Sequence, residues 1–314
     1  LLRRAWDRWL DLERETGERL LVETGGLYVG APGSAIVEGS LRSAREHGLA
    51  HEVLDAATMR ERFPALRVDG GMVGLHEAKA GYLVPERCIE AHLALAERRG
   101  AALRFGEVVE RWAADGSGVR VETTGGRYRA ERLVIAAGAW LPRLLPDLGV
   151  PFEVERVTLF WFEPSVPQPF ERLPVYIVET DWDGSFYGFP YMPDQGLKVA
   201  RHGSGERADP DALDRSRRGA DEERVRRFVR RHLPEGDGPL REAKVCLYTK
   251  TPDEHFVVDR HPARERVVFA SACSGHGFKF ASVIGEALAD LALDGRTSLP
   301  IGFLSLRRFA RSGT

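Results

Sequence analysis

The spacing of apolar residues along the chain predicts several helices, because a helix face repeats every three to four positions. In the first of these ranges, Trp6, Trp9 and Leu10 fall on one apolar side. Another begins after Pro85, a residue that suits a first helical turn. The ranges with this pattern are 1–18, 34–47, 57–63, 86–99, 221–233 and 280–294, the last of which ends at Gly295.

Strands are predicted where apolar and polar residues alternate, or where a short apolar run is bounded by turn residues. Residues 22–31 indicate a pair of strands around a Gly-Gly dipeptide, and residues 152–202 are rich in strand-forming and aromatic residues. Two continuous apolar runs, 133–137 and 267–271, are typical of buried strands. The other expected strands are 102–105, 108–113, 119–123, 127–130, 244–249 and 256–259.

These elements predict a mixed α/β (α+β) protein, and a chain of 314 residues is long enough for two domains. Buried strands that lead into glycine turns suggest an α/β domain, and the β-rich middle suggests an antiparallel sheet. We expect the α/β domain to take residues 1–20, 85–150 and 252–314. The antiparallel domain then takes residues 21–84 and 151–251.

Composition narrows the possible functions. The chain is 43% hydrophobic and 29% charged, as in soluble globular proteins, and its net charge of -2 gives no broad field for nucleic acid or membranes. Three cysteines argue against a disulfide framework and suit a reducing cytoplasm. No stretch of 18 apolar residues, no C-x-x-C, no H-E-x-x-H and no G-x-S-x-G occurs. We therefore expect a cytoplasmic protein with no metal site and no nucleic-acid or membrane partner.

A glycine turn with the sequence SGHGFK at residues 274–279 separates the apolar run 267–271 from the final helix. Free N–H groups and the helix dipole favour negative charge at such a helix start, and Lys279 adds a cation three residues after His276. An anionic ligand, or a cofactor that becomes anionic, fits this position. Taken alone, the segment is also explained by an ordinary turn with a solvated lysine.

Several other motifs accompany this turn: AKVCLYTKTPDEHFVVDRH at 243–261, VIAAGAW at 134–140, FYGFP at 186–190 and GLK at 196–198. Together they resemble the monomeric sarcosine oxidase family, which are flavin-dependent amine oxidases related to N-methyltryptophan oxidase and more distantly to D-amino acid oxidase. The resemblance runs over essentially the whole chain. It implies an FAD-binding Rossmann-like domain, an antiparallel-sheet substrate domain and a monomer.

The start of the chain departs from the family pattern. The family begins with a strand, a G-x-G-x-x-G turn and a helix that bind the ADP part of FAD, and the sequence holds no such motif. Leu1 instead opens directly into helix-like sequence. The resemblance therefore implies that an N-terminal βαβ unit of about 30 residues is missing, with an arginine that would help bind the substrate carboxylate. A miscalled gene start would give the same sequence.

The resemblance also implies covalent FAD attachment at Cys246, because the matching cysteine of the family is joined to the flavin ring. Alternation along 244–249 places Cys246 and Tyr248 on one face, and nearby cations would favour the thiolate that such a bond needs. A buried cysteine acting as a small hydrophobe is the alternative. Cys273 is a second, weaker candidate, and Cys88 is expected in the core. Further cofactor-binding residues implied by the resemblance are Val109, Ala137, Gly138, Trp140, Ser274, Gly275, His276, Gly277 and Lys279.

The implied catalytic residues are Lys198, Lys279, His276, His202, Tyr187 and Tyr248. By resemblance, Lys279 helps to hold the substrate carboxylate and His276 lies beside the flavin. Lys198 has apolar neighbours in its strand, and the matching lysine of the family serves oxygen activation, since a fixed cation stabilises superoxide. The alternative for Lys198 is an ordinary cross-strand lysine. His202, four residues on, lies near the substrate or makes a simple polar contact, and two tyrosines form walls of the cavity.

These inferences predict an FAD-dependent oxidase of a secondary (N-methyl) amino acid such as sarcosine or N-methyltryptophan. The expected products are an imine and hydrogen peroxide, and the expected partners are a small amino acid and oxygen. Two alternatives stay open: a flavoprotein dehydrogenase of the same superfamily, and an inactive fragment unable to bind FAD.

Overall fold

A computed structural model describes residues 1–203 and 205–309 as a mixed α/β fold, as predicted. The helices are α1 (Leu2–Thr16), α2 (Ala35–Glu46), α3 (Ala56–Arg62), α4 (Pro85–Arg98), α5 (Leu141–Leu144), α6 (Gln168–Glu171), α7 (Gly219–His232) and α8 (Ala281–Asp294). All six ranges predicted from apolar spacing are confirmed. Left-handed glycines end the first and last helices, with φ of 76° at Gly17 and 72° at Gly295. No helix in the described residues is long and apolar enough to cross a membrane.

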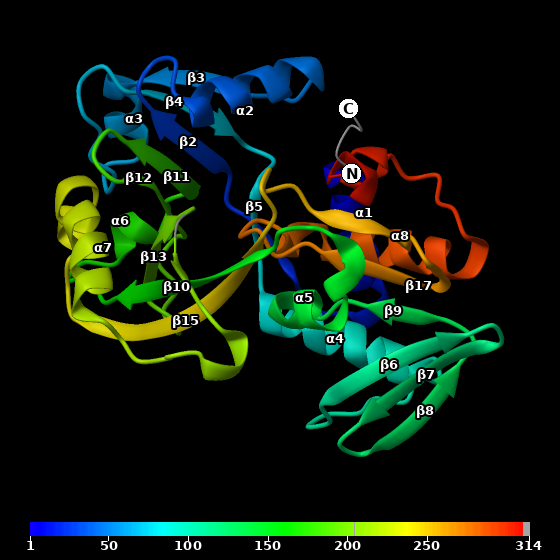
Figure 1. Cartoon of the computed structure of the whole chain (residues 1–314). Coiled ribbons are helices and arrows are strands. Elements are labelled where there is room, and N and C mark those ends of the chain that lie inside the picture. The colour runs from blue at the N-terminus through cyan, green and yellow to red at the C-terminus, as the bar shows by residue number, and fades with distance from the viewer. Residues whose placement is uncertain (204, 310–314) are drawn as a thin grey trace, which may run out of the picture.

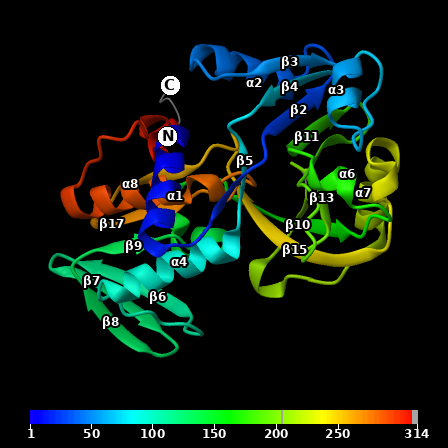
Figure 2. The same ribbon diagram turned by 180° about the vertical axis from the view of Figure 1, so that it is seen from behind.

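A nine-stranded sheet forms one of two bodies that lie side by side in Figures 1 and 2. Its strands run in the order β14-β10-β13-β12-β11-β2-β4-β3, with β15 paired to β10. Every pairing in it is antiparallel except that of β2 with β11. The bounds are β2 (Gly26–Gly30), β3 (Glu52–Asp55), β4 (Val73–Glu77), β10 (Glu153–Phe162), β11 (Val175–Thr180), β12 (Gly184–Gly188), β13 (Leu197–His202), β14 (Glu206–Arg207) and β15 (Leu240–Lys250).

Alternation along these strands gives the sheet two chemically different faces. One face carries Phe160, Val199 and Phe186, which pack with Phe228 and Val229 of α7 in the largest core cluster. The stacked rings of Phe186 and Phe228 lie 4.5 Å apart between centroids. Because neighbouring strand positions point to opposite sides, the residues between these apolar ones lie on the other face. That face carries the candidate chemistry.

The second body is built on a three-stranded sheet, β16 (Val257–His261), β17 (Arg264–Ser271) and β9 (Leu133–Ile135). Helix α8 covers it through Ile284 and Leu288, which pack against Val258 and Val268. An antiparallel sheet of β6 (Val109–Asp115), β7 (Gly118–Thr123) and β8 (Gly126–Ala130) lies below it in Figure 1. The short strands β1 (Leu21–Glu23) and β5 (Gly81–Leu83) pair where the chain passes between the bodies.

Two strand predictions are wrong. The strands in 22–31 do not pair with each other: β1 pairs with β5, while β2 joins β4 and β11, because Gly25, with φ of 75°, turns the chain from one sheet to the next. Residues 102–105 form no strand. The backbone of Ala101 still bonds to the end of α4, and the Phe105 side chain is 75% exposed, so no neighbouring strand covers it.

Candidate active site

The second face of the large sheet brings five predicted site residues together. Cys246 and Tyr248 come from β15, Lys198 and His202 from β13, and Tyr187 from β12. The ring of His202 lies 6.1 Å from that of Tyr187 and 6.2 Å from that of Tyr248, between centroids. Three strands of one sheet therefore present one cluster, and β15 follows the other two only after helix α7.

The glycine turn of residues 274–279 packs against this cluster. A Cβ atom on Gly275 would lie 2.5 Å from the ring of Tyr248, and the φ of 91° at this glycine also disfavours any side chain. Gly277 is tighter still, since its Cβ would lie 1.6 Å from a backbone oxygen. Both glycines are therefore needed for the turn to bring His276 and Lys279 to the sheet.

Both tyrosines of the cluster stay protonated at neutral pH. Burial raises the pKa of Tyr187 well above its ordinary value, and the neighbouring Tyr248 hydroxyl raises it further. Burial also raises the pKa of Tyr248. The pair thus offers neutral hydroxyl groups and aromatic walls, which suit a cavity from which water is excluded.

The two histidines are kept neutral by their surroundings. Burial lowers the pKa of His202, and the positive charges of Lys250 and Lys279 lower it further. Burial and then the charge of Lys279 lower the pKa of His276. His276 Nε2 lies 3.3 Å from the carbonyl oxygen of Glu254. Neutral rings of this kind can bind a substrate amine without repelling it.

Two lysines at the site have no carboxylate within ion-pair distance among the described residues. Lys198 Nζ lies 5.1 Å from the ring centre of Trp161 and 4.7 Å from that of Phe189, and burial lowers its pKa. Lys279 Nζ donates to the backbone oxygen of His276 at 3.0 Å. The Lys279 side chain remains accessible to solvent, yet the surrounding protein atoms lower its pKa. Unneutralised cations of this kind form a site for a negatively charged ligand.

The surroundings of the cysteines set Cys246 apart. Burial raises the pKa of its thiol, but Lys198, Arg215 and Lys244 act in the opposite direction. Burial also raises the pKa of Cys273, opposed by a backbone hydrogen bond rather than by a cation among the described residues. Cys88 is fully buried, as expected, and has its pKa raised to about 11. Cys246 is therefore the thiol that is best placed to react.

The other predicted cofactor residues lie in the second body. Gly138 follows the end of β9, and Trp140 Nε1 donates to Asp211 at 2.6 Å. Val109 and Ala137 line an apolar groove of about 200 Å³ beside β9. The turn of Gly138–Trp140 also approaches β15, the strand that carries Cys246.

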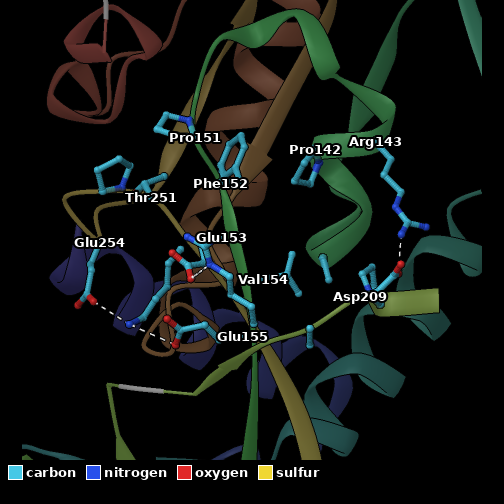
Figure 3. Close-up of a pocket in the computed structure, with 16 residues that line it drawn as sticks. Pro142, Arg143, Pro151, Phe152, Glu153, Val154, Glu155, Asp209, Thr251 and Glu254 are labelled. Carbon is cyan, nitrogen blue, oxygen red and sulfur yellow. Dashed lines mark hydrogen bonds and ion pairs between the residues drawn. The ribbon is translucent and has the colours of Figure 1, made fainter. Parts of the chain in front are cut away.

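A larger hollow of about 720 Å³ lies where the end of β15 meets α5 and the start of β10. In Figure 3 the carboxylates of Glu155 and Glu254 are joined by dashed lines to one ammonium group, which is that of Lys250. The Lys250 Nζ atom also donates to the backbone oxygen of Gly203 at 2.5 Å. Burial alone would lower the pKa of Lys250. The ammonium group donates to the carboxylates of Glu254 and Glu155, however, and these contacts outweigh burial and raise the pKa.

Sequence reasoning missed Trp161, Lys244 and Lys250. A compositional signal points to the lysines, because only five of the 45 basic residues are lysine and four of these lie at or beside the cluster. Arginine is the cation in nearly all ion pairs on the surface of the described residues. Lysine is a compact cation whose pKa shifts readily on burial, and arginine cannot replace it in that role.

These residues fit a large cofactor that carries negative charge and hydrogen-bond acceptors. Within the described residues, the buried hydroxyls of Ser274, Ser271 and Thr249 and the indole N–H of Trp161 have no hydrogen-bond partner. Buried donors are normally satisfied, and among these the indole of Trp161 lies 5.1 Å from Lys198 Nζ, a cation that also lacks a carboxylate among the described residues. FAD is consistent with this donor set.

Comparison with known proteins decides the family. The sequence pattern of the family described as FAD dependent oxidoreductase matches residues 1–291. The chain belongs to this family. The family resemblance seen in the sequence is thereby confirmed, together with the fold class.

Relatives of this FAD-dependent oxidoreductase match it along nearly its whole length. Monomeric sarcosine oxidase of Streptomyces avermitilis is 45% identical over an alignment of 316 positions that covers 99% of this chain and 82% of the relative. N-methyl-L-tryptophan oxidase of Salmonella heidelberg is 34% identical over 314 residues, 99% of this chain and 83% of the relative.

Solved structures share the fold. NikD, described as an unusual amino acid oxidase essential for nikkomycin biosynthesis, has a TM-score of 0.84 at 25% identity, covering 97% of this chain and 81% of that one. The L-proline dehydrogenase of P. horikoshii has a TM-score of 0.86 at 19% identity, covering 99% of this chain and 82% of that one.

Proposed function

We propose that this FAD-dependent oxidoreductase oxidises a secondary, N-methyl amino acid such as sarcosine or N-methyltryptophan to an imine, with oxygen reduced to hydrogen peroxide. The carrying observation is the single cluster of two unneutralised lysines, two neutral histidines and two buried tyrosines. The names of the relatives, sarcosine oxidase and N-methyl-L-tryptophan oxidase, support the same substrate class.

We propose that Cys246 holds FAD covalently through its sulfur, since it is the thiol with cations around it. When bound, FAD supplies the redox chemistry, taking a hydride equivalent from the amine and passing two electrons to oxygen. The glycine turn would offer its backbone and the Ser274 hydroxyl to the cofactor. In the second body, the adenosine end of FAD would be held by Val109, Ala137, Gly138 and Trp140.

The protein's own groups bind and orient the substrate. Lys279 would attract the carboxylate of the amino acid, because its ammonium has no carboxylate partner among the described residues. The rings of Tyr187 and Tyr248 would shield the N-methyl group from water. The neutral rings of His202 and His276 would accept a hydrogen bond from the substrate nitrogen without placing a like charge beside it.

Lys198 would serve the reaction with oxygen. Its ammonium is held between two aromatic rings on the same face as Cys246. A fixed positive charge in a poorly hydrated site stabilises the negative charge that develops as oxygen accepts an electron.

We also propose that the two bodies divide the work. The second body, from residues 1–20, 85–150 and 252–314, would bind FAD, and the large sheet, from residues 21–84 and 151–251, would bind the substrate. The three free cysteines fit a reducing cytoplasm, and we propose a cytoplasmic monomer.

Oxygen consumption with sarcosine, N-methyl-L-tryptophan and glycine tests this function. We expect a secondary amine to be oxidised with one peroxide formed for each oxygen consumed, and glycine to react far more slowly. Substrate loss without matching peroxide would indicate a dehydrogenase instead. No reaction with any secondary amino acid by FAD-loaded protein would overturn the proposal.

Replacement of Lys279 tests how the carboxylate is bound. Lys279→Met should raise KM for the amino acid by about 10- to 100-fold, the loss expected for one charge-assisted bond. Lys79→Met is the matched control, because it removes another lysine that lies over an aromatic ring, that of Trp6 on α1, and its KM should be unchanged. Equal KM values for both variants would contradict this role of Lys279.

A further inference from the structure

We propose that Trp161 is a positioning residue that holds the ammonium group of Lys198 beside Cys246 by a cation–π contact, in the place where a carboxylate would otherwise stand. Only the role of Lys198 in the reaction with oxygen rests on the proposed function. The contact between Trp161 and Lys198 does not depend on catalysis and can be tested without turnover.

The register of the sheet fixes this arrangement. Trp161 of β10 lies directly opposite Lys198 of β13, so both side chains leave the same face. On the other side of β10, Lys244 of β15 places its Nζ 5.5 Å from the same indole ring. Phe189 closes the cage from beyond β12, at 4.7 Å from Lys198 Nζ. The indole is 5% exposed and therefore cannot turn away.

The two lysines on this indole differ in their partners. Lys244 Nζ is 3.1 Å from Glu242 and more than half exposed, so its charge is neutralised and hydrated. Lys198 has no carboxylate within ion-pair distance in the described residues. The titratable groups that act on Lys198 are Cys246 and Lys244 of β15 and Glu86 at the start of α4.

An aromatic cage can stabilise the ammonium group of Lys198 without neutralising its charge, which a carboxylate cannot do. The negative face of an aromatic ring stabilises an ammonium ion, and most strongly where water is scarce. It does so without adding a formal negative charge. The site therefore keeps a net positive charge for an anionic ligand or for negative charge that develops on oxygen. A carboxylate in the same place would cancel that field.

The small number of lysines allows each one to be titrated separately. The chain has five lysines, so labelling each amine with acetic anhydride across a pH series, followed by peptide mass spectrometry, gives a separate titration midpoint for each. We would compare the unsubstituted protein with the variants Trp161→Leu, Trp161→Phe and Phe189→Leu. Circular dichroism would confirm that each variant is folded.

Trp161→Leu should lower the midpoint of Lys198 by about one pH unit, because the charged form loses its stabilising ring. Trp161→Phe, which keeps a ring with a weaker face, should lower it by about half as much. Phe189→Leu should lower the midpoint of Lys198 by about as much as Trp161→Phe does. This variant keeps the proposal testable if Trp161→Leu does not fold. The midpoints of Lys279 and Lys79 should stay the same.

Trp6→Leu is the matched control, since Trp6 carries a lysine at 5.3 Å in the same way but outside the site. It should leave Lys198 unchanged. An unchanged Lys198 midpoint in folded Trp161→Phe and Phe189→Leu would overturn the inference. The result is independent of turnover. If the midpoint shifts in a protein that oxidises no amine, the proposed function is contradicted but the role of Trp161 is not.

Discussion

The environment of each lysine decides what it can do, and the four lysines at or beside the site differ in how many carboxylates they contact. Lys250 is neutralised by two carboxylates, Lys244 pairs with Glu242, and Lys198 and Lys279 lack any carboxylate partner among the described residues. The resemblance to a family pointed to Lys198 and Lys279. Lys244 and Trp161 could not be predicted in this way, because their roles depend on which strands pair.

The rate of reaction with oxygen should depend on the charge of Lys198. Burial lowers the pKa of Lys198 from its ordinary value of 10.5, so the ammonium is lost at a lower pH than in water. We expect the rate to be full below this pKa and to fall as pH rises through it. Lys198→Met should slow reoxidation by about 100- to 1,000-fold below this pKa, and by progressively less above it.

Stopped-flow reoxidation of reduced protein across pH measures this dependence. Lys198→Arg keeps its charge at high pH and should lose the alkaline decline while retaining part of the rate. An alkaline decline of equal size in Lys198→Met would contradict a role for the ammonium.

At the scale of elements, the glycine turn before α8 joins the two bodies at the site. Its place between a buried strand and a helix was predictable, since β17 and α8 have clear apolar patterns. The contact of Gly275 with Tyr248 was not, because nothing local in the sequence says that the turn meets β15. The same limit explains the wrong pairing expected in residues 22–31, whose partners lie in distant strands.

Gly275→Ala should destabilise the protein and weaken cofactor binding, because the new Cβ meets the Tyr248 ring and the φ of 91° is strained for alanine. We expect a loss of about 1–3 kcal/mol in the free energy of unfolding, measured by urea denaturation. Gly285→Ala is the matched control: Gly285 lies within α8 and its added Cβ would meet nothing. It should gain about 0.5–1 kcal/mol. Equal stability of the two variants would show that the turn can relax.

At the scale of the whole molecule, the site lies where the large sheet faces the second body, and neither part supplies it alone. The sheet contributes Cys246, Lys198 and the tyrosines, and the second body contributes His276 and Lys279. Composition and apolar spacing predicted the mixed α/β class. The nine-stranded order of the sheet followed only from the structure, since pairings such as β11 with β2 link residues about half the chain apart.

A visible absorption spectrum of the purified protein, before and after acid precipitation, tests most directly whether this chain is a flavin oxidase with FAD on Cys246. We expect a flavin spectrum whose yellow colour stays with the precipitated protein, and in Cys246→Ser a colour that passes to the supernatant. Cys273→Ser should behave like the unsubstituted protein. Colour released from the unsubstituted protein would contradict the covalent bond, and a protein without flavin absorption after incubation with FAD would contradict the proposed function itself.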